Sequence, residues 1–181
     1  MLLIEPKSWW RSAFEVTEPS TGTKFLLSPR GFREGCSFKL DGDQYELKRQ
    51  HWSGGPFLLE CNGSVLLRAH KPSAFKRSFE LKYGRERFTV AAGSMWSRAY
   101  VLRQGSRVLG RIERTSWWSQ RAEADLPEDL PLIFRVFVVS LVLLMWRREH
   151  GAAVSGSWPP REAGSPPTIG AACWPMDRAA P

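Results

Sequence analysis

The residues best suited to acid–base, nucleophilic or metal chemistry lie far apart in this chain of 181 residues. Its three histidines and three cysteines form no metal-ligand spacing, disulfide framework or catalytic pair. Asp41 and Asp43 flank Gly42, but two local carboxylates are too few for a calcium loop, so this stretch is interpreted as a turn. We therefore expect no catalytic residues, no metal, no cofactor, and a protein that is not an enzyme.

Positive charge is the strongest chemical signal in the sequence. The net charge is +8, and residues 68–121 hold thirteen Lys and Arg against three Glu. Loops at one end of a meander recur on the same rim, so we expect some of these cations to form one face that binds an anionic headgroup. The alternative is a barrel that merely carries Lys and Arg on its outer face. The predicted binding residues are Lys76, Arg77, Arg85, Arg87, Arg103, Arg107, Arg111 and Arg114.

Two tryptophan pairs accompany this charge, Trp9-Trp10 and Trp117-Trp118. Adjacent residues of a strand face opposite sides, so one Trp of each pair is expected to face outward. Trp beside Arg is typical of a membrane interface, and we predict Trp117 and Trp118 as interface aromatics. Single-stranded nucleic acid, which stacks on aromatics beside basic grooves, is the less favoured partner. A third interpretation is that loops or termini cover both pairs.

Residues 8–128 have the pattern of successive β-hairpins. Apolar and charged residues alternate, as Phe79 and Leu81 do with Glu80 and Lys82, which predicts strands with one apolar face. Asp-Gly and Asn-Gly between such runs are strong hairpin signals. The predicted strands are 8–16, 24–28, 36–40, 44–49, 57–61, 65–70, 78–83, 86–92, 99–103 and 108–113.

The hairpins recur with a regular spacing. Gly42, Gly63, Gly84 and Gly105 are each 21 residues apart, which indicates a meander of similar hairpins, as a closed sheet requires. A weaker repeat has twice that period, because GSVLLRAHKPSAFKRSFE resembles GSRVLGRIERTSWWSQRAE with one inserted residue. Duplication and chance similarity both remain open as explanations.

The single long apolar run, LPLIFRVFVVSLVLLMW at 130–146, predicts a helix. Pro131 suits the first turn of a helix, and the run is apolar on all sides, so it must be buried all round, in a core or in a membrane. Arg135 within it must reach a barrel mouth or a buried carboxylate, for which Glu128 and Asp129 are the candidates.

The number of strands favours the core. Ten to twelve strands precede residue 125, whereas about eight already fill a barrel with their own side chains, so a larger barrel must enclose something. We expect a mainly β fold, a roughly 12-stranded antiparallel barrel of hairpins around one central apolar C-terminal helix. The predicted organisation is an N-terminal extension at 1–7, the barrel at 8–148 with its helix at 130–148, and a disordered Gly/Ala/Pro-rich tail at 149–181.

The expected location is cytoplasmic, at a membrane surface. The opening MLLIEPKSWW reaches Glu5 after Met1 and three further apolar residues, too few for a signal-peptide core, and the sparse cysteines favour a reducing compartment. The alternative is an integral membrane protein anchored by residues 130–146.

The order of these features resembles the superfamily that unites the tubby C-terminal domain, the LURP-one-related proteins and the phospholipid scramblases. The resemblance covers residues 8–148 and rests on the hairpins, the strand LGRIER at 109–114, and DLPEDLPLIFRVFVVSLVLLMWRR at 125–148. It implies a 12-stranded barrel around a central apolar helix.

The resemblance also implies a function. Tubby domains bind phosphoinositide headgroups through basic residues, and scramblases are membrane-associated. The palmitoylated cysteine run of scramblases is absent here, which argues against that role. We expect a non-enzymatic module that binds anionic, phosphoinositide-like headgroups at a membrane surface. The alternatives are the membrane-anchored protein, a ligand-free scaffold and a nucleic-acid-binding barrel.

Overall fold

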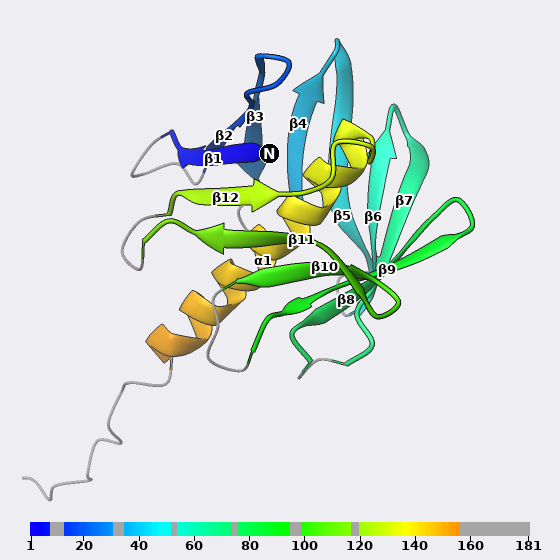
Figure 1. The fold of residues 1–181 in the computed structure, drawn as a ribbon, viewed down its shortest axis with the longest axis vertical. Helices are drawn as coiled ribbons and strands as arrows, with labels where there is room; N and C mark the ends of the chain where they lie inside the picture. The colour runs from blue at the N-terminus through cyan, green and yellow to red at the C-terminus, as the bar shows by residue number, and fades with distance from the viewer. Residues whose placement is uncertain are drawn as a thin grey trace, which may run out of the picture.

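The computed structural model (Figure 1) describes residues 1–7, 13–30, 35–51, 54–73, 76–94, 99–116 and 120–155. Antiparallel strands are followed by one helix, α1 (Leu132–Ser155). The strands are β1 (Leu2–Pro6), β2 (Phe14–Glu18), β3 (Thr23–Pro29), β4 (Gly35–Leu40), β5 (Asp43–His51), β6 (Gly54–Cys61), β7 (Ser64–His70), β8 (Ser78–Tyr83), β9 (Glu86–Ala92), β10 (Tyr100–Gln104), β11 (Arg107–Arg114) and β12 (Ala122–Asp125).

The strands form a closed barrel in chain order, in which β1 pairs with both β2 and β12. The predicted 12-stranded antiparallel barrel is therefore confirmed. The prediction of residues 1–7 as an extension was wrong, because Leu2–Pro6 form the strand that closes the ring. β12 was also missed, since its sequence AEAD carries little strand signal.

The hairpin turns divide the barrel into two ends. Asp41 and Gly42 both have positive φ (53° and 87°), as do Asn62 and Gly63 (49° and 84°), which matches the two-residue type I′ turns that Asp-Gly and Asn-Gly favour. Alternate connections of an antiparallel meander lie at the same end. We call this end, with the turns after β2, β4, β6, β8 and β10, the turn end, and the opposite one the tail end.

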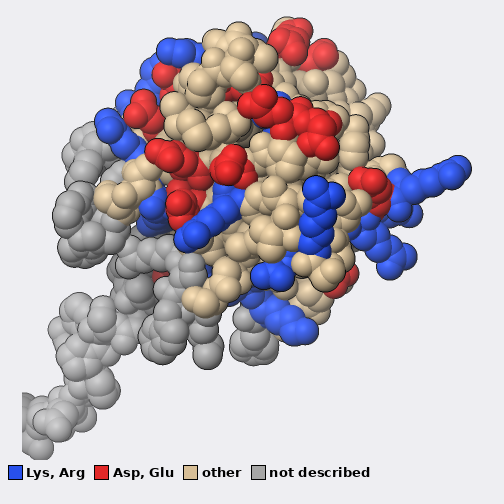
Figure 2. Space-filling view, in the orientation of Figure 1, with Lys and Arg blue, Asp and Glu red and all other residues tan. Residues whose placement is uncertain are grey.

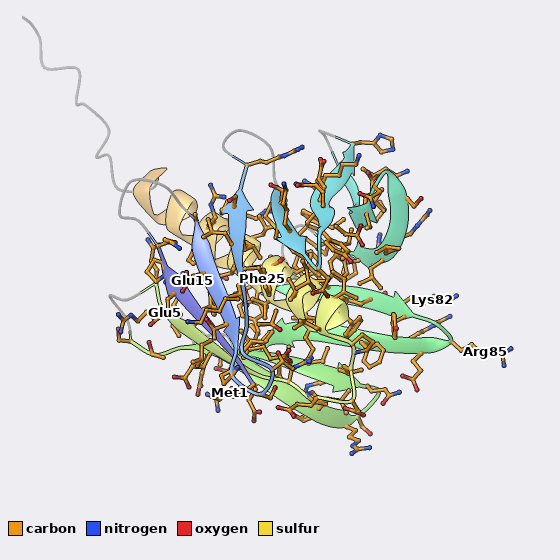
Figure 3. The ribbon with its side chains drawn as sticks, turned by 90° about the horizontal axis from the view of Figure 1, so that it is seen from above. Met1, Glu5, Glu15, Phe25, Lys82 and Arg85 are labelled. Carbon is orange, nitrogen blue, oxygen red and sulfur yellow. The ribbon has the colours of Figure 1, made fainter. Side chains whose placement is uncertain are left out.

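Helix α1 runs through the barrel from the turn end to the tail end (Figures 1 and 3). Every side chain from Phe134 to Trp146 is buried. The centre of the Phe134 ring lies 5.3 Å from the ring centre of Tyr83 on β8 and 5.0 Å from that of Phe88 on β9. The ring centres of Trp146 and Tyr100, on β10, are 6.1 Å apart. A helix apolar on all sides is thus covered on all sides by the sheet.

The helix is displaced along the chain relative to its prediction at 130–148. It begins at Leu132 and continues to Ser155, so the first residues of the predicted tail are helical. Residues 156–181, the rest of that tail, lie outside the described part of the chain. In the described ranges, no helix is both long and apolar enough to cross a membrane.

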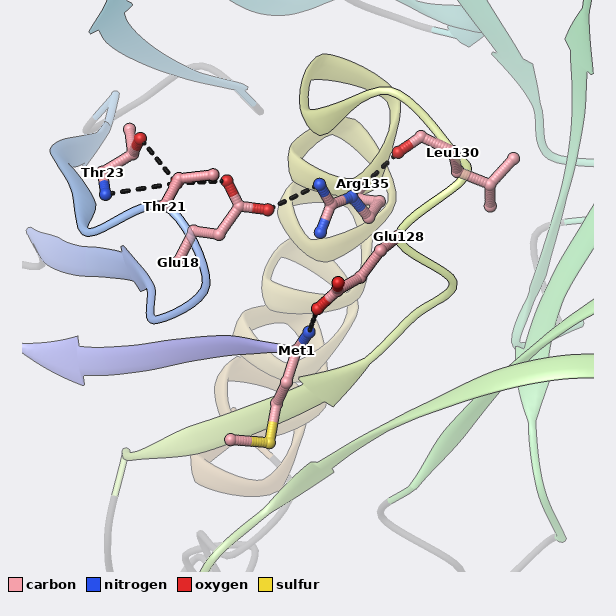
Figure 4. Close-up of polar contacts among 7 residues, drawn as sticks. All are labelled: Met1, Glu18, Thr21, Thr23, Glu128, Leu130 and Arg135. Carbon is pink, nitrogen blue, oxygen red and sulfur yellow. Dashed lines mark hydrogen bonds and ion pairs between the residues drawn. The ribbon is translucent and has the colours of Figure 1, made fainter.

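A buried ion pair holds the start of the helix (Figure 4). Arg135 Nη2 lies 2.5 Å from Glu18 Oε1, with both side chains almost fully buried, and Arg135 Nε donates a hydrogen bond to the Leu130 carbonyl. The prediction that Glu128 or Asp129 would pair with Arg135 was wrong. Glu128 instead accepts from the amino terminus of Met1, 3.4 Å away, at the surface.

Glu18 is charged because its partners outweigh its burial. Burial alone would raise the pKa of this carboxyl, but the hydrogen bonds from Thr21 Oγ1 (2.7 Å) and Arg135, with the charge of Arg135, lower its pKa below the ordinary 4.5. Arg135 Nη1 remains buried without a hydrogen-bond partner among the described residues. The pair is therefore only partly satisfied.

Val139→Asp tests the central position of the helix. Val139 is 1% exposed in the middle of α1, and an unpaired charge there costs several kcal/mol, comparable to the whole stability of a domain. We expect loss of the β-sheet circular dichroism spectrum and of cooperative melting. Leu26→Asp on β3, where Leu26 is 38% exposed, is the control and should fold. A folded Val139→Asp protein would contradict the buried helix.

Glu18→Gln tests the ion pair. Removing one partner leaves a buried charge and should cost about 3–5 kcal/mol, whereas replacing both, as Glu18→Leu with Arg135→Met, should be neutral or stabilising. Chemical denaturation measures both free energies of unfolding. Equal destabilisation by the single and double variants would show that lost packing, and not an unpaired charge, lowers the free energy of unfolding.

Acid should weaken the barrel through Glu18. Its folded pKa is below the unfolded value, so its contribution to stability is fully present above about pH 4.5 and is lost as the pH falls through the folded pKa. Thermal melting from pH 7 to pH 3 measures this loss. The Glu18→Leu, Arg135→Met protein should lack this component, and an unchanged acid profile would contradict the assignment.

Candidate anion-binding site

Three cations stand side by side on the outer face of the barrel. The strand register pairs Arg68 of β7 with Lys82 of β8, and Lys82 with Arg87 of β9. All three side chains are exposed, while the neighbouring Leu81 and Phe88 are buried, as the alternation of a half-buried strand requires. We call Arg68, Lys82 and Arg87 the cation row.

The cation row has no internal charge compensation. Among the described residues, none of its three members forms an ion pair. Like charges directly opposite one another in a sheet are destabilising. An anion bound between them would reverse the sign of that interaction, because Arg and Lys both bind phosphate oxygens with charge-assisted hydrogen bonds.

The cation row borders a hollow of about 570 Å³. On the same three strands, two residues farther from the β8–β9 turn, the register places His70 opposite Glu80 and Glu80 opposite Thr89. The hollow is therefore lined by one carboxylate together with three cations, an imidazole and a hydroxyl. The volume suits a phosphorylated headgroup rather than a macromolecular segment. The lining residues are Pro56, Arg68, His70, Glu80, Leu81, Lys82, Arg87, Phe88 and Thr89.

The structure brings only part of the predicted set to one place. Arg87 belongs to the cation row, and Arg85 lies in the turn beside it. Arg103 pairs with Thr89, which places it diagonally across from Arg87, and Arg107 begins the next strand at the same end. These four cations gather at the turn end, and none forms an ion pair among the described residues.

The other predicted cations lie elsewhere. Lys76 is exposed at the tail end, and Arg111 pairs with Glu113 at 2.8 Å on the outer face of β11. Arg114 lies at the tail end with its guanidinium 4.7 Å from the centre of the Trp146 ring. The predicted interface aromatics Trp117 and Trp118, and the pair Trp9-Trp10, lie outside the described residues.

Arg77 forms polar contacts with Glu149, in the tail-end part of α1. Its Nε donates to Glu149 Oε1 at 2.7 Å, the Tyr100 hydroxyl donates to the same oxygen at 2.8 Å, and the guanidinium lies 5.5 Å from the Tyr100 ring centre. Although burial alone would lower it, these interactions raise the pKa of Arg77. Arg77 is thus engaged with α1.

Sequence reasoning missed Arg68 and Lys82. The sequence did contain a signal for Lys82. It lies two residues before the Gly84-Arg85 turn and Arg87 lies two residues after it, so the two side chains stand opposite each other on the charged face. Adding Arg68 requires the register between two hairpins, which depends on the longer connection between β7 and β8.

Surface charge is unevenly distributed (Figure 2). Lys and Arg project at the right of this view, on the side where the β8–β9 hairpin lies in Figure 1, while Asp and Glu lie across the middle of the face. Figure 3 shows Lys82 and Arg85 pointing away from the barrel at this hairpin. The cation row therefore lies on a protruding basic edge.

Other chemistry has little support in the described ranges. No three His, Cys, Asp or Glu side chains there lie close enough to hold a metal ion. Burial raises the pKa of the Cys36 thiol to about 12, so this cysteine stays protonated and is a poor nucleophile.

Comparison of the chain with protein-family models, curated proteins and solved structures found no match.

Proposed function

We propose that this protein is a non-enzymatic module that binds anionic, phosphoinositide-like lipid headgroups at a cytoplasmic membrane surface through the cation row. The observation that carries the proposal is the register of Arg68, Lys82 and Arg87 beside a hollow of headgroup size, without ion-pair partners among the described residues. Multiply charged phosphate groups are the anions that such a row of Arg and Lys suits best.

The charges around the row support a membrane rather than a free ligand. Arg85, Arg103 and Arg107 lie near it at the turn end, so the positive surface extends beyond the hollow. Each Lys or Arg close to an anionic bilayer contributes about 1 kcal/mol of attraction. Several together give reversible, salt-sensitive binding to a membrane surface.

We also propose that the chain belongs to the tubby, LURP-one-related and scramblase superfamily. Its support is architectural: a closed antiparallel barrel of 12 strands around one apolar C-terminal helix, in the order that the resemblance implies. Headgroup binding through basic residues in tubby domains agrees with the proposed role of the cation row.

Replacing the cation row by glutamine tests the function. Vesicle co-sedimentation should show that the wild-type protein prefers phosphatidylcholine vesicles containing phosphoinositide over pure phosphatidylcholine. The variant with Arg68→Gln, Lys82→Gln and Arg87→Gln should bind about a hundredfold more weakly, since three contributions of about 1 kcal/mol are lost.

The control changes the same net charge elsewhere. Lys7→Gln, Arg30→Gln and Arg147→Gln remove three exposed cations from the tail end, where Lys7 follows β1, Arg30 follows β3 and Arg147 lies on α1. This protein should keep most of the binding. Equal losses in both triple variants would reduce the effect to net charge, and wild-type indifference to vesicle charge would overturn the proposal.

A further inference from the structure

The β6–β7 hairpin carries a bulge next to its turn. Glu60 pairs with Val65, but the next pair is Leu59 with Leu67. Leu66 is therefore an extra residue without a cross-strand partner. Such bulges redirect side chains, and Leu66 is 50% exposed beside Val65, which is 40% exposed.

The β10–β11 hairpin has a β-bulge at the equivalent place. Arg103 pairs with Val108, and the next pair is Leu102 with Gly110, so Leu109 is the extra residue. Val108 is 55% exposed, more than any other large apolar residue described. Val108 and Leu109 correspond to Val65 and Leu66 when the segments that start at residues 63 and 105 are aligned with their one inserted residue.

The two apolar tips flank the cationic one. Sheet order places the β8–β9 hairpin, with Lys82, Arg85 and Arg87, between the β6–β7 and β10–β11 hairpins, and all three tips lie at the turn end (Figure 1). Most of the exposed large apolar side chains that the structure describes lie at this end rather than scattered over the barrel.

An apolar–cationic–apolar edge matches one partner by its chemistry. The surface of an anionic bilayer presents negative headgroups to cations and, just below them, an apolar layer to short hydrophobic side chains. A purely aqueous anion would leave Val65, Leu66 and Val108 in water.

We propose that Val65 with Leu66 and Val108 insert into the headgroup–acyl boundary of an anionic membrane as two apolar wedges, while the cation row between them binds headgroups. This inference rests on the proposed function and adds the orientation: the turn end faces the bilayer and the tail end faces the cytoplasm.

The experiment compares three variants with the wild-type protein on vesicles of phosphatidylcholine with phosphoinositide and on monolayers of the same lipids. In the variant with Val65→Ser, Leu66→Ser and Val108→Ser, we expect binding about tenfold weaker and most of the surface-pressure rise lost. Val108→Trp should change both in the opposite direction, because Trp favours the interface. Leu26→Ser, a comparably exposed leucine on β3, should behave as wild type.

The outcomes separate this inference from the proposed function. Because the substituted side chains are exposed, all three variants should melt as wild type does. If the wild type binds acidic vesicles but the serine variant binds equally and raises the surface pressure equally, attraction is electrostatic alone and the wedges are excluded, whereas headgroup binding stands. If the wild type binds no vesicles, both proposals fall.

Discussion

The whole structure depends on covering a helix that has no polar face. From Phe134 to Trp146, Arg135 and Ser140 are the only polar side chains of α1, so the stretch is stable only inside a surface that surrounds it. A ring of 12 strands needs the helix in turn, because strand side chains alone leave such a barrel hollow. Helix and sheet thus fold as one unit, and closure by β1 and β12 is a condition for both.

Apolar packing is non-directional, so the polar contacts at the two ends define how far the helix is inserted. Arg135 meets Glu18 at the turn end, and Glu149 meets Arg77 and Tyr100 at the tail end. The two ion pairs differ in the free-energy cost of removing their charges from water. The first pair is buried and only partly satisfied, whereas the second retains access to solvent.

In a barrel filled by its own helix, the candidate binding surface lies on the outer face. The strongest candidate, the cation row, has one member that the sequence predicted, Arg87, and two that it did not, Arg68 and Lys82. Position along the chain identified a basic region, but which cations stand side by side depends on register across β7, β8 and β9. Arg77 and Arg114, equally basic in sequence, lie at the opposite end against the helix.

Local chemistry in the sequence by itself determined the hairpins, their glycine turns and the uniformly apolar helix, because turn conformation and side-chain alternation depend on adjacent residues. The tertiary structure alone decided the rest. Leu2–Pro6 became a strand by pairing with distant β12, and Arg135 found Glu18 rather than the nearby Glu128, since ring closure brings the ends of the domain together. Long-range register, which no local pattern encodes, placed three cations in one row.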